Sequence, residues 1–178
     1  GANVWLERFK LSGSAVCGDA TELAFRSNVF DGVISSDFFE HITDEQKRSA
    51  LEEIYRVLKP GRPLVIKTPN LQYLRLSLCY KRAREILRLK SPRRITIPHT
   101  PGEEDPQHIG LTTRWRLARQ LAQAGFLNHR RAYAPFRRFG LSALFEVAST
   151  EIPILRDWLC EDLFFIAMKP VVLSYFPD

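Results

Sequence analysis

Short apolar runs alternate along this chain with longer segments of helical periodicity. Three runs have the character of buried strands: "FDGVISS" (Phe30–Ser36), "PLVIKTP" (Pro63–Pro69) and "LFFIAMK" (Leu163–Lys169). The second run is so apolar that we expect both of its faces to be covered. We also expect a short strand and its exit turn at "AVCGDA" (Ala15–Ala20), and a weaker strand at "HRRAYAP" (His129–Pro135). This alternation is typical of an α/β domain with a mainly parallel sheet.

Helix signals are clearest between the Phe30–Ser36 and Pro63–Pro69 runs. Thr43 and Gln46 have the spacing of a capping box, apolar residues then recur at helical spacing, and "KPG" ends the pattern. A strand, a helix and a strand in this order predict a right-handed parallel unit. Farther along, Thr112 or Thr113 is expected to cap another helix that ends before a glycine and a phenylalanine.

The segment Leu71–Lys90 has leucines and an isoleucine at helical spacing among many basic residues, which predicts a basic amphipathic helix. Ser91–Gly110 is rich in proline and glycine and is expected to be a long loop, a kind of segment that is usually functional or mobile. The net charge of the 178 residues is +6. This charge is explained either by a solvated basic surface or by an acidic or phosphorylated partner.

Composition excludes several classes of protein. No apolar run is long enough to span a membrane, and charged residues interrupt the start of the chain, so we expect neither a transmembrane segment nor a signal peptide. The three cysteines are far apart and odd in number, which argues against a disulfide framework or a zinc site and suits a cytoplasmic location. We therefore expect no metal. Because the chain begins Gly1-Ala2 rather than with Met, we expect a processed or truncated product.

Polar residues follow three of the predicted strands at their carboxyl ends, in the stretches Gly18–Ala20, Ser35–His41 and Thr68–Asn70. In open parallel sheets, ligands bind beyond these ends. If the strands are neighbours, the three stretches meet at one crevice. An aspartate there can accept hydrogen bonds from the amino or hydroxyl groups of a ligand, and an aromatic side chain can cover a flat ring.

Several motifs occur in an order that resembles a known family. Gly18–Asn70 contains "GDA", "FDGV", "EH" and "RVLKPG" in sequence, and it resembles the middle of a class I S-adenosylmethionine-dependent methyltransferase of the methyltransferase type 11 kind. "HIGLTTRWRLARQLAQAGF" (His108–Phe126) and "LFFIAMKP" (Leu163–Pro170) resemble later elements of the same family. The resemblance implies S-adenosylmethionine as cofactor and one methyltransferase-like domain over residues 1–178. In that domain, 71–110 would be a basic helix and loop inserted over the substrate.

The resemblance also implies a fold and a set of site residues. The fold would be Rossmann-like, with a mostly parallel sheet, flanking helices, an antiparallel strand near the C-terminus and the strand order 3-2-1-4-5-7-6. Asp19 and Ala20 would bind the adenine, although a simple turn also explains this acid. Ser36, Asp37 and Phe38 would flank the methionine part and the transferred methyl group. Packing beneath the next helix is the alternative for Phe38 and Phe39, and we expect one of the two to have that role.

The beginning of the chain departs from the family pattern. No Gly-x-Gly-x-Gly motif occurs, so we expect the first family strand, its glycine-rich loop and the next helix to be missing. "NVWLERF" (Asn3–Phe9) would then be a remnant of the second family strand, with Glu7 on the ribose hydroxyls, or else an unrelated strand or frayed terminus. Without its neighbour, the strand within Phe30–Ser36 would have a bare edge. We expect either Asn3–Phe9 or a second copy of the chain, as a homodimer, to cover that edge.

Two histidines are candidates for acid–base chemistry. His41 follows a strand end and His108 ends the long loop, so either is placed to act as a general base on an acceptor hydroxyl. For His41, a role in starting the next helix is the alternative. Because methyl transfer is a direct displacement on a carbon that the cofactor carries, a base is needed only if the acceptor must lose a proton.

Three functions are compatible with these patterns. The first is methyl transfer to a small-molecule acceptor, anionic in view of the basic helix, or to a sugar or lipid intermediate. The second is a truncated, non-catalytic methyltransferase-like remnant that acts in protein interaction. The third is a binder of nucleic acid or of anionic membrane surfaces through Leu71–Arg94.

Overall fold

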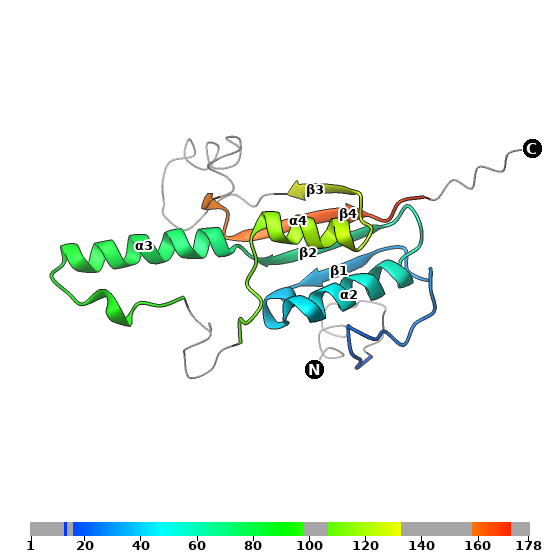
Figure 1. Cartoon of the computed structure of the whole chain (residues 1–178), viewed down its shortest axis with the longest axis horizontal. Coiled ribbons are helices and arrows are strands. Elements are labelled where there is room, and N and C mark those ends of the chain that lie inside the picture. Colours follow the sequence, from blue (N-terminus) through cyan, green and yellow to red (C-terminus); the bar gives the residue numbers. More distant parts are fainter. Residues whose placement is uncertain (1–12, 14–15, 98–106, 133–157, 172–178) are drawn as a thin grey trace, which may run out of the picture.

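The computed structural model describes residues 13, 16–97, 107–132 and 158–171. There, four strands form one sheet in the order β1-β2-β4-β3 (Figure 1). β1 (Val33–Ser36) is parallel to β2 (Pro63–Pro69), whereas β4 (Asp162–Met168) is antiparallel to both β2 and β3 (Asn128–Ala132). The strands β1, β2, β4 and β3 correspond in position to strands 4, 5, 7 and 6 of the order 3-2-1-4-5-7-6 that the family resemblance implies. The α/β fold with an antiparallel strand near the C-terminus is therefore confirmed.

Two helices lie on the same face of this sheet, α2 (Asp44–Val57) over β1 and α4 (Arg114–Gln123) over β2 and β4 (Figure 1). Their apolar stripes and the inward residues of β2 and β4 form the core. Its buried members include Leu51, Ile54, Leu64, Ile66, Leu117, Leu121, Phe126, Phe165 and Ala167. Burial of such side chains, at about 1.5–3 kcal/mol each, is the main force that holds these elements together.

Local capping fixes where both helices begin. The hydroxyl of Thr43 accepts from the backbone N–H of Gln46, whose side chain accepts in return from the Thr43 N–H, so the predicted capping box is confirmed. Thr113 caps α4 through the N–H of Arg116. Gly125 follows α4 with φ +94°, the left-handed conformation predicted for that glycine.

The opposite face of the sheet is less covered. Burial alternates along β2: Leu64, Ile66 and Thr68 are buried and the residues between them are half-buried. On that other face Ile34 is 79% exposed and Ile166 is 36% exposed. The prediction that both faces of Pro63–Pro69 are covered is not met by the residues that the structure describes, because both α2 and α4 pack on one side.

The edge at β1 has no strand partner within the described ranges. Residues 16–18 form no strand, and Asp19 makes only an isolated bridge with Glu22, so the strand predicted at "AVCGDA" is wrong for its described part. A strand needs a neighbour to receive its hydrogen bonds, and no described strand lies beside this segment. Asn3–Phe9, with Glu7, lies outside the described residues, so the covering of the β1 edge remains a prediction.

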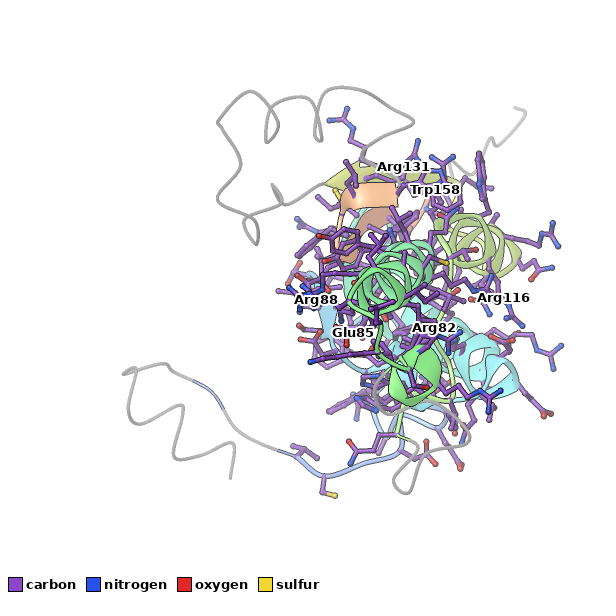
Figure 2. The ribbon with its side chains drawn as sticks, turned by 90° about the vertical axis from the view of Figure 1, so that its left-hand side faces the viewer. Arg82, Glu85, Arg88, Arg116, Arg131 and Trp158 are labelled. Atoms are coloured by element: carbon purple, nitrogen blue, oxygen red, sulfur yellow. The ribbon has the colours of Figure 1, made fainter. Side chains whose placement is uncertain are left out.

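α3 (Leu71–Leu87) projects from the end of β2 beyond the sheet (Figure 1). Tyr73 is its one buried residue, and Leu87 is 85% exposed. Viewed nearly along the helix, Arg82 and Arg88 project to different sides (Figure 2). The predicted basic helix is confirmed, but its apolar side is packed only near the start, because the outer turns extend past the described body of the domain. The short helix η2 (Pro92–Arg94) folds back against it. No described helix has the length and apolarity needed to cross a membrane.

Candidate functional site

The carboxyl end of β1 forms a sharp polar turn. Asp37 has φ +52°, a left-handed conformation that is uncommon for a residue with a side chain, and its N–H donates to the Lys67 carbonyl at 3.0 Å. The hydroxyl of Ser36 donates to Asp37 Oδ2 at 2.9 Å. Lys67 Nζ donates to both carboxylate oxygens, at 2.6 and 2.9 Å. These contacts, above all the one from Lys67, hold the pKa of Asp37 below its ordinary value.

Lys67 also lies 3.6 Å from the carboxylate of Asp162, at the start of β4. Burial raises the pKa of Asp162, and the charge of Lys67 opposes that rise. One lysine therefore bridges two carboxylates at this edge of the sheet. Lys67 was not among the predicted site residues; the signal for it in the sequence is a lysine near the end of an otherwise apolar strand.

The two phenylalanines after this turn have different surroundings. Phe39 is fully buried in the core, whereas Phe38 is partly buried and packs against that core. Their rings meet edge to face, with centroids 5.8 Å apart. Packing beneath the next helix is thus the role of Phe39, and Phe38 retains an accessible part beside Asp37.

The short helix η1 (Phe39–His41) brings a third group to the same region. Glu40 is 2% exposed, and Thr68 donates from Oγ1 to Glu40 Oε2 at 2.9 Å. His41 Nε2 is 3.9 Å from Glu40 Oε1, and its Nδ1 is 3.0 Å from the Gln107 carbonyl oxygen. The rings of His41 and His108 have centroids 5.2 Å apart. The two histidines selected from the sequence are therefore neighbours.

Backbone contacts fix the loop that carries His108. Gly110 donates its N–H to the Glu40 carbonyl at 2.8 Å, and its own carbonyl accepts from Lys47 Nζ. A Cβ on Gly110 would lie 2.0 Å from the Ile42 carbonyl oxygen, so only glycine allows this approach. Lys47 is fully buried, and burial lowers its pKa. Lys47 was not among the predicted site residues, although it lies in helical register with the apolar residues of α2.

Asp19 and Ala20, the predicted adenine contacts, lie in a local turn. Asp19 Oδ1 accepts from both the N–H and the hydroxyl of Thr21, each at 2.8 Å, and the backbone hydrogen bond is the main reason that the pKa of Asp19 is lowered. The side chain is exposed. This geometry is that of a simple turn, the alternative given above for Asp19. No described contact joins Asp19 to Ser36 or Asp37. Its role toward a cofactor remains a prediction, as does that of Glu7, which lies outside the described residues.

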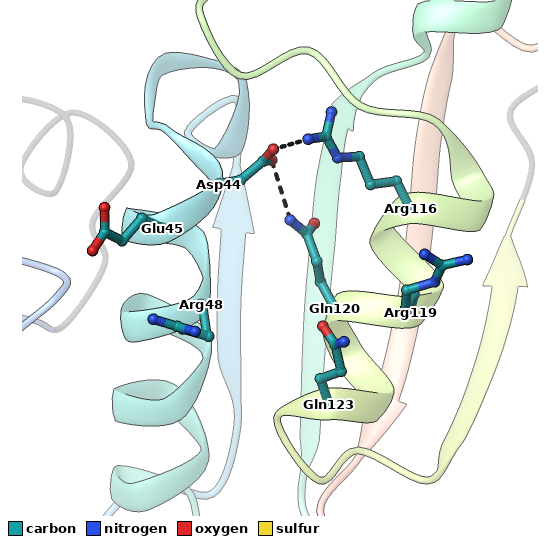
Figure 3. A pocket seen from close by; sticks show the side chains of 7 residues that line it. All are labelled: Asp44, Glu45, Arg48, Arg116, Arg119, Gln120 and Gln123. Atoms are coloured by element: carbon teal, nitrogen blue, oxygen red, sulfur yellow. Dashed lines mark hydrogen bonds and ion pairs between the residues drawn. The ribbon is translucent and has the colours of Figure 1, made fainter.

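A separate hollow lies between α2 and α4 (Figure 3). Asp44 reaches across it to the Arg116 guanidinium and accepts from Gln120 Nε2 at 3.2 Å. Its lining comes wholly from these two helices and carries both signs of charge. It is therefore a polar groove between helices and does not include the strand ends where the sequence predicts a ligand.

Comparison with known proteins supports the family resemblance. Residues 3–66 match the family described as a methyltransferase domain. An uncharacterised protein of Methanocaldococcus jannaschii is 35% identical over 65 residues, which cover 36% of this chain and 28% of that protein.

Among solved structures, a SAM-dependent methyltransferase from Archaeoglobus fulgidus is similar with a TM-score of 0.56 and 22% identity, covering 86% of this chain and 66% of that one. A phosphoethanolamine N-methyltransferase from Haemonchus contortus, in complex with phosphomonomethylethanolamine and S-adenosylhomocysteine, has a TM-score of 0.50 and 21% identity, covering 86% and 36%. The chain thus spans less than two thirds of each of these proteins. It shares the fold of these S-adenosylmethionine-dependent methyltransferases, and residues 3–66 match the methyltransferase domain family, in agreement with the resemblance.

Proposed function

We propose that the chain binds S-adenosylmethionine at the carboxyl ends of β1 and β2 and transfers its methyl group to a small-molecule, sugar or lipid-intermediate acceptor. The observation that carries the proposal is the turn at the end of β1. There, a hydroxyl and a carboxylate, on Ser36 and Asp37, lie next to the partly buried ring of Phe38. Ligands of open α/β sheets bind at such strand ends.

The charge of this turn suits the methionine end of the cofactor, which carries an ammonium group. Because the pKa of Asp37 is lowered, its carboxylate is ionised at neutral pH. Lys67 forms an ion pair with this carboxylate, so a bound ammonium group would have to share the carboxylate with Lys67. Asp19 and Ala20 are proposed for the adenine and Glu7 for the ribose, as the family resemblance implies.

The cofactor supplies the reactive methyl carbon, and the protein aligns the acceptor with it and excludes water. His41 follows the Ser36–Asp37 turn closely in the chain, and the ring of His108 lies beside that of His41, with the centroids 5.2 Å apart. We propose that this pair lies on the acceptor side of the cofactor. If the acceptor must lose a proton, these are the candidate bases.

The acceptor is proposed to be anionic, with residues 71–110 as a lid over it. α3 begins directly after β2, where Asn70 caps it, and it carries exposed arginines and lysines along its outer turns. A surface of that charge attracts phosphate or carboxylate groups. The similar methyltransferase from Haemonchus contortus was solved with a phosphate-bearing ligand, which is consistent with this proposal.

Calorimetric titration with S-adenosylhomocysteine tests the cofactor site. We expect Asp37→Ala to weaken binding by about tenfold or more, the loss of one charged contact. Asp31→Ala is the matched control, because Asp31 is an exposed, lysine-paired acid just before β1, at the opposite end of the strand. Absence of binding by the unmodified chain would favour the non-catalytic remnant. Equal loss in both variants would contradict the placement of the site.

Homodimerisation through the β1 edge is proposed from the lack of a strand partner there within the described residues. Light scattering during size-exclusion chromatography tests it, with Ile34→Lys, on the exposed edge strand, as the disrupting variant. A monomer at all concentrations would contradict this proposal.

The cytoplasmic location remains a prediction from the cysteines, all three of which are free thiols.

A further inference from the structure

We propose that Glu40, His41 and His108 bind a single divalent transition-metal ion. One ligand atom from each residue lies within 4.8 Å of the other two, and Glu40 Oε1 and His41 Nε2 are 3.9 Å apart. Ligand atoms on a shared ion, with bonds of about 2.1 Å, are separated by about 3–3.5 Å. The three ligand atoms must therefore move closer together by about 1 Å when an ion binds.

The hydrogen bond made by His41 prepares its ring for this role. Nδ1 is 3.0 Å from the Gln107 carbonyl oxygen, which can only accept, so Nδ1 carries the proton. In the neutral ring the lone pair is then on Nε2, the nitrogen that faces Glu40. Metal-binding histidines commonly have this arrangement, because a backbone carbonyl on one nitrogen orients the other toward the ion.

The carboxylate of Glu40 lacks a close, fully charged partner in the described structure. It is 2% exposed, and the neutral hydroxyl of Thr68 occupies Oε2. The nearby ammonium of Lys47 is bonded to the Gly110 carbonyl and to Asp44. A buried carboxylate is costly unless a cation or several donors compensate it. An ion between Oε1 and the two histidines would supply that compensation.

The third ligand arrives from a distant part of the sequence, and its approach is fixed by the backbone. The loop that carries His108 is bonded on both sides of it: the Gln107 carbonyl accepts from His41, and the Gly110 N–H donates to the Glu40 carbonyl. Both contacts attach the loop to the same short helix that carries the other two ligands. One side chain–backbone contact and one backbone–backbone hydrogen bond therefore hold the three side chains near one another before an ion binds.

Two imidazoles and one carboxylate favour Zn²⁺, Co²⁺, Mn²⁺ or Fe²⁺ over Mg²⁺ and Ca²⁺, which prefer oxygen ligands throughout. Three protein ligands leave coordination positions for water or for an oxygen atom of another ligand. The expectation of no metal came from the cysteines, whereas this site contains none. The proposal goes beyond methyl transfer, and it changes the role of the two histidines from proton acceptance to metal ligation.

Titration of the whole chain with Zn²⁺ alone, and absorption spectroscopy with Co²⁺ alone, test the site. A background of Cys17→Ser and Cys79→Ser removes the two exposed thiols, which bind both ions. We expect one ion per chain with micromolar or tighter affinity, and Co²⁺ absorption bands without thiolate charge transfer. His108→Ala is expected to weaken binding by about 100-fold, as loss of a ligand costs at least as much as loss of a second-sphere partner.

His129→Ala is the matched control, because His129 lies on β3 against Phe165, away from the three ligands. Thr68→Val is a second test, since it leaves all three ligands in place; we expect about tenfold weaker binding from loss of the hydrogen bond that orients Glu40. No binding, or equal affinity in the His108→Ala and His129→Ala proteins, would overturn the proposal. Because S-adenosylhomocysteine binding is measured separately, the metal site and the cofactor site can fail independently.

Discussion

Lys169→Met probes the contact that ties the end of β4 to the end of α2. Lys169 follows β4, is 8% exposed, and donates from Nζ to Asn28 Oδ1 at 2.8 Å and to the carbonyls of Tyr55 and Leu58 at 2.7 Å each. These carbonyls belong to the last turn of α2 and its C-cap, where the helix dipole is negative. Methionine keeps most of the side-chain volume and removes the cation.

The size of the effect follows from these contacts. Loss of a cation at a partly buried helix end costs about 0.5–2 kcal/mol, and a buried acceptor left unpaired costs about 1–3 kcal/mol. Burial lowers the pKa of Lys169, because the charged form is costly to bury. Removing the charge therefore offsets part of the stability lost with the hydrogen bonds. We expect a net decrease of about 3 kcal/mol in the free energy of unfolding, or about 6–12 °C in Tm for a chain of this length.

Urea denaturation measures this decrease directly, as a lower midpoint at unchanged slope. Lys59→Met is the matched control: Lys59 pairs with Asp31 on the surface, where the two side chains are 41% and 62% exposed. Such a pair contributes about 0–1 kcal/mol. If the Lys169→Met protein is destabilised no more than the Lys59→Met protein, the bonding of Lys169 to the end of α2 contributes little and the reasoning is refuted.

Three further predictions address other contacts. Gly110→Ala should lower the free energy of unfolding by about 2 kcal/mol or more, because its Cβ would overlap the Ile42 carbonyl; urea denaturation measures this. Thr43→Ala should cost about 1 kcal/mol through loss of the capping box, seen as a lower Tm. Asp37 has a lowered pKa, so its stabilising pairing with Lys67 is present above about pH 4 and is lost as the pH falls through the lower folded-state pKa. Asp37→Asn should remove that part of the acid dependence. Measuring the free energy of unfolding between about pH 5 and pH 2 detects the difference.

Each of these has its own control. Gly18→Ala, where a Cβ meets nothing within 4 Å, should leave stability nearly unchanged, and an equal effect at both glycines would contradict the packing argument. A Thr43→Ser protein should keep the cap and its stability. If the Asp37→Asn and unmodified proteins lose stability in parallel as the pH falls, the Lys67 pairing does not contribute.

The elements that could be predicted from the sequence are those set by local signals. Pro63–Pro69 was predicted with the observed bounds, and the start of α2 followed from Thr43. The cap of α4 was predicted at Thr112 or Thr113, and it is Thr113. These predictions succeed because capping and periodicity depend on residues a few positions apart. The exposed outer half of α3 could not be predicted. Its leucines have the spacing of a packed helix, and whether a partner exists is a property of the tertiary structure.

The candidate site was predicted in part, for the same reason. Ser36 and Asp37 stand at a strand end that the periodicity reveals, so their place at the edge of the sheet followed from the sequence. The meeting of His41 with His108 depends on a loop whose return is fixed by Gly110, and nothing in the local pattern distinguishes that glycine from others. Lys67 was overlooked because its partners lie on neighbouring strands.

The projecting helix has a consequence for hydrogen exchange. α3 has 17 residues and is therefore about 26 Å long, but tertiary burial is limited to its first turns. Past these turns η2 folds back against the helix, and Arg82 Nε donates to the Ile95 carbonyl at 3.0 Å. Helical segments this short are marginal in water on their own. The amides of the last turns of α3 should therefore exchange by local opening, orders of magnitude faster than those of α2, and a ligand that ordered them would slow that exchange without changing the rest of the domain.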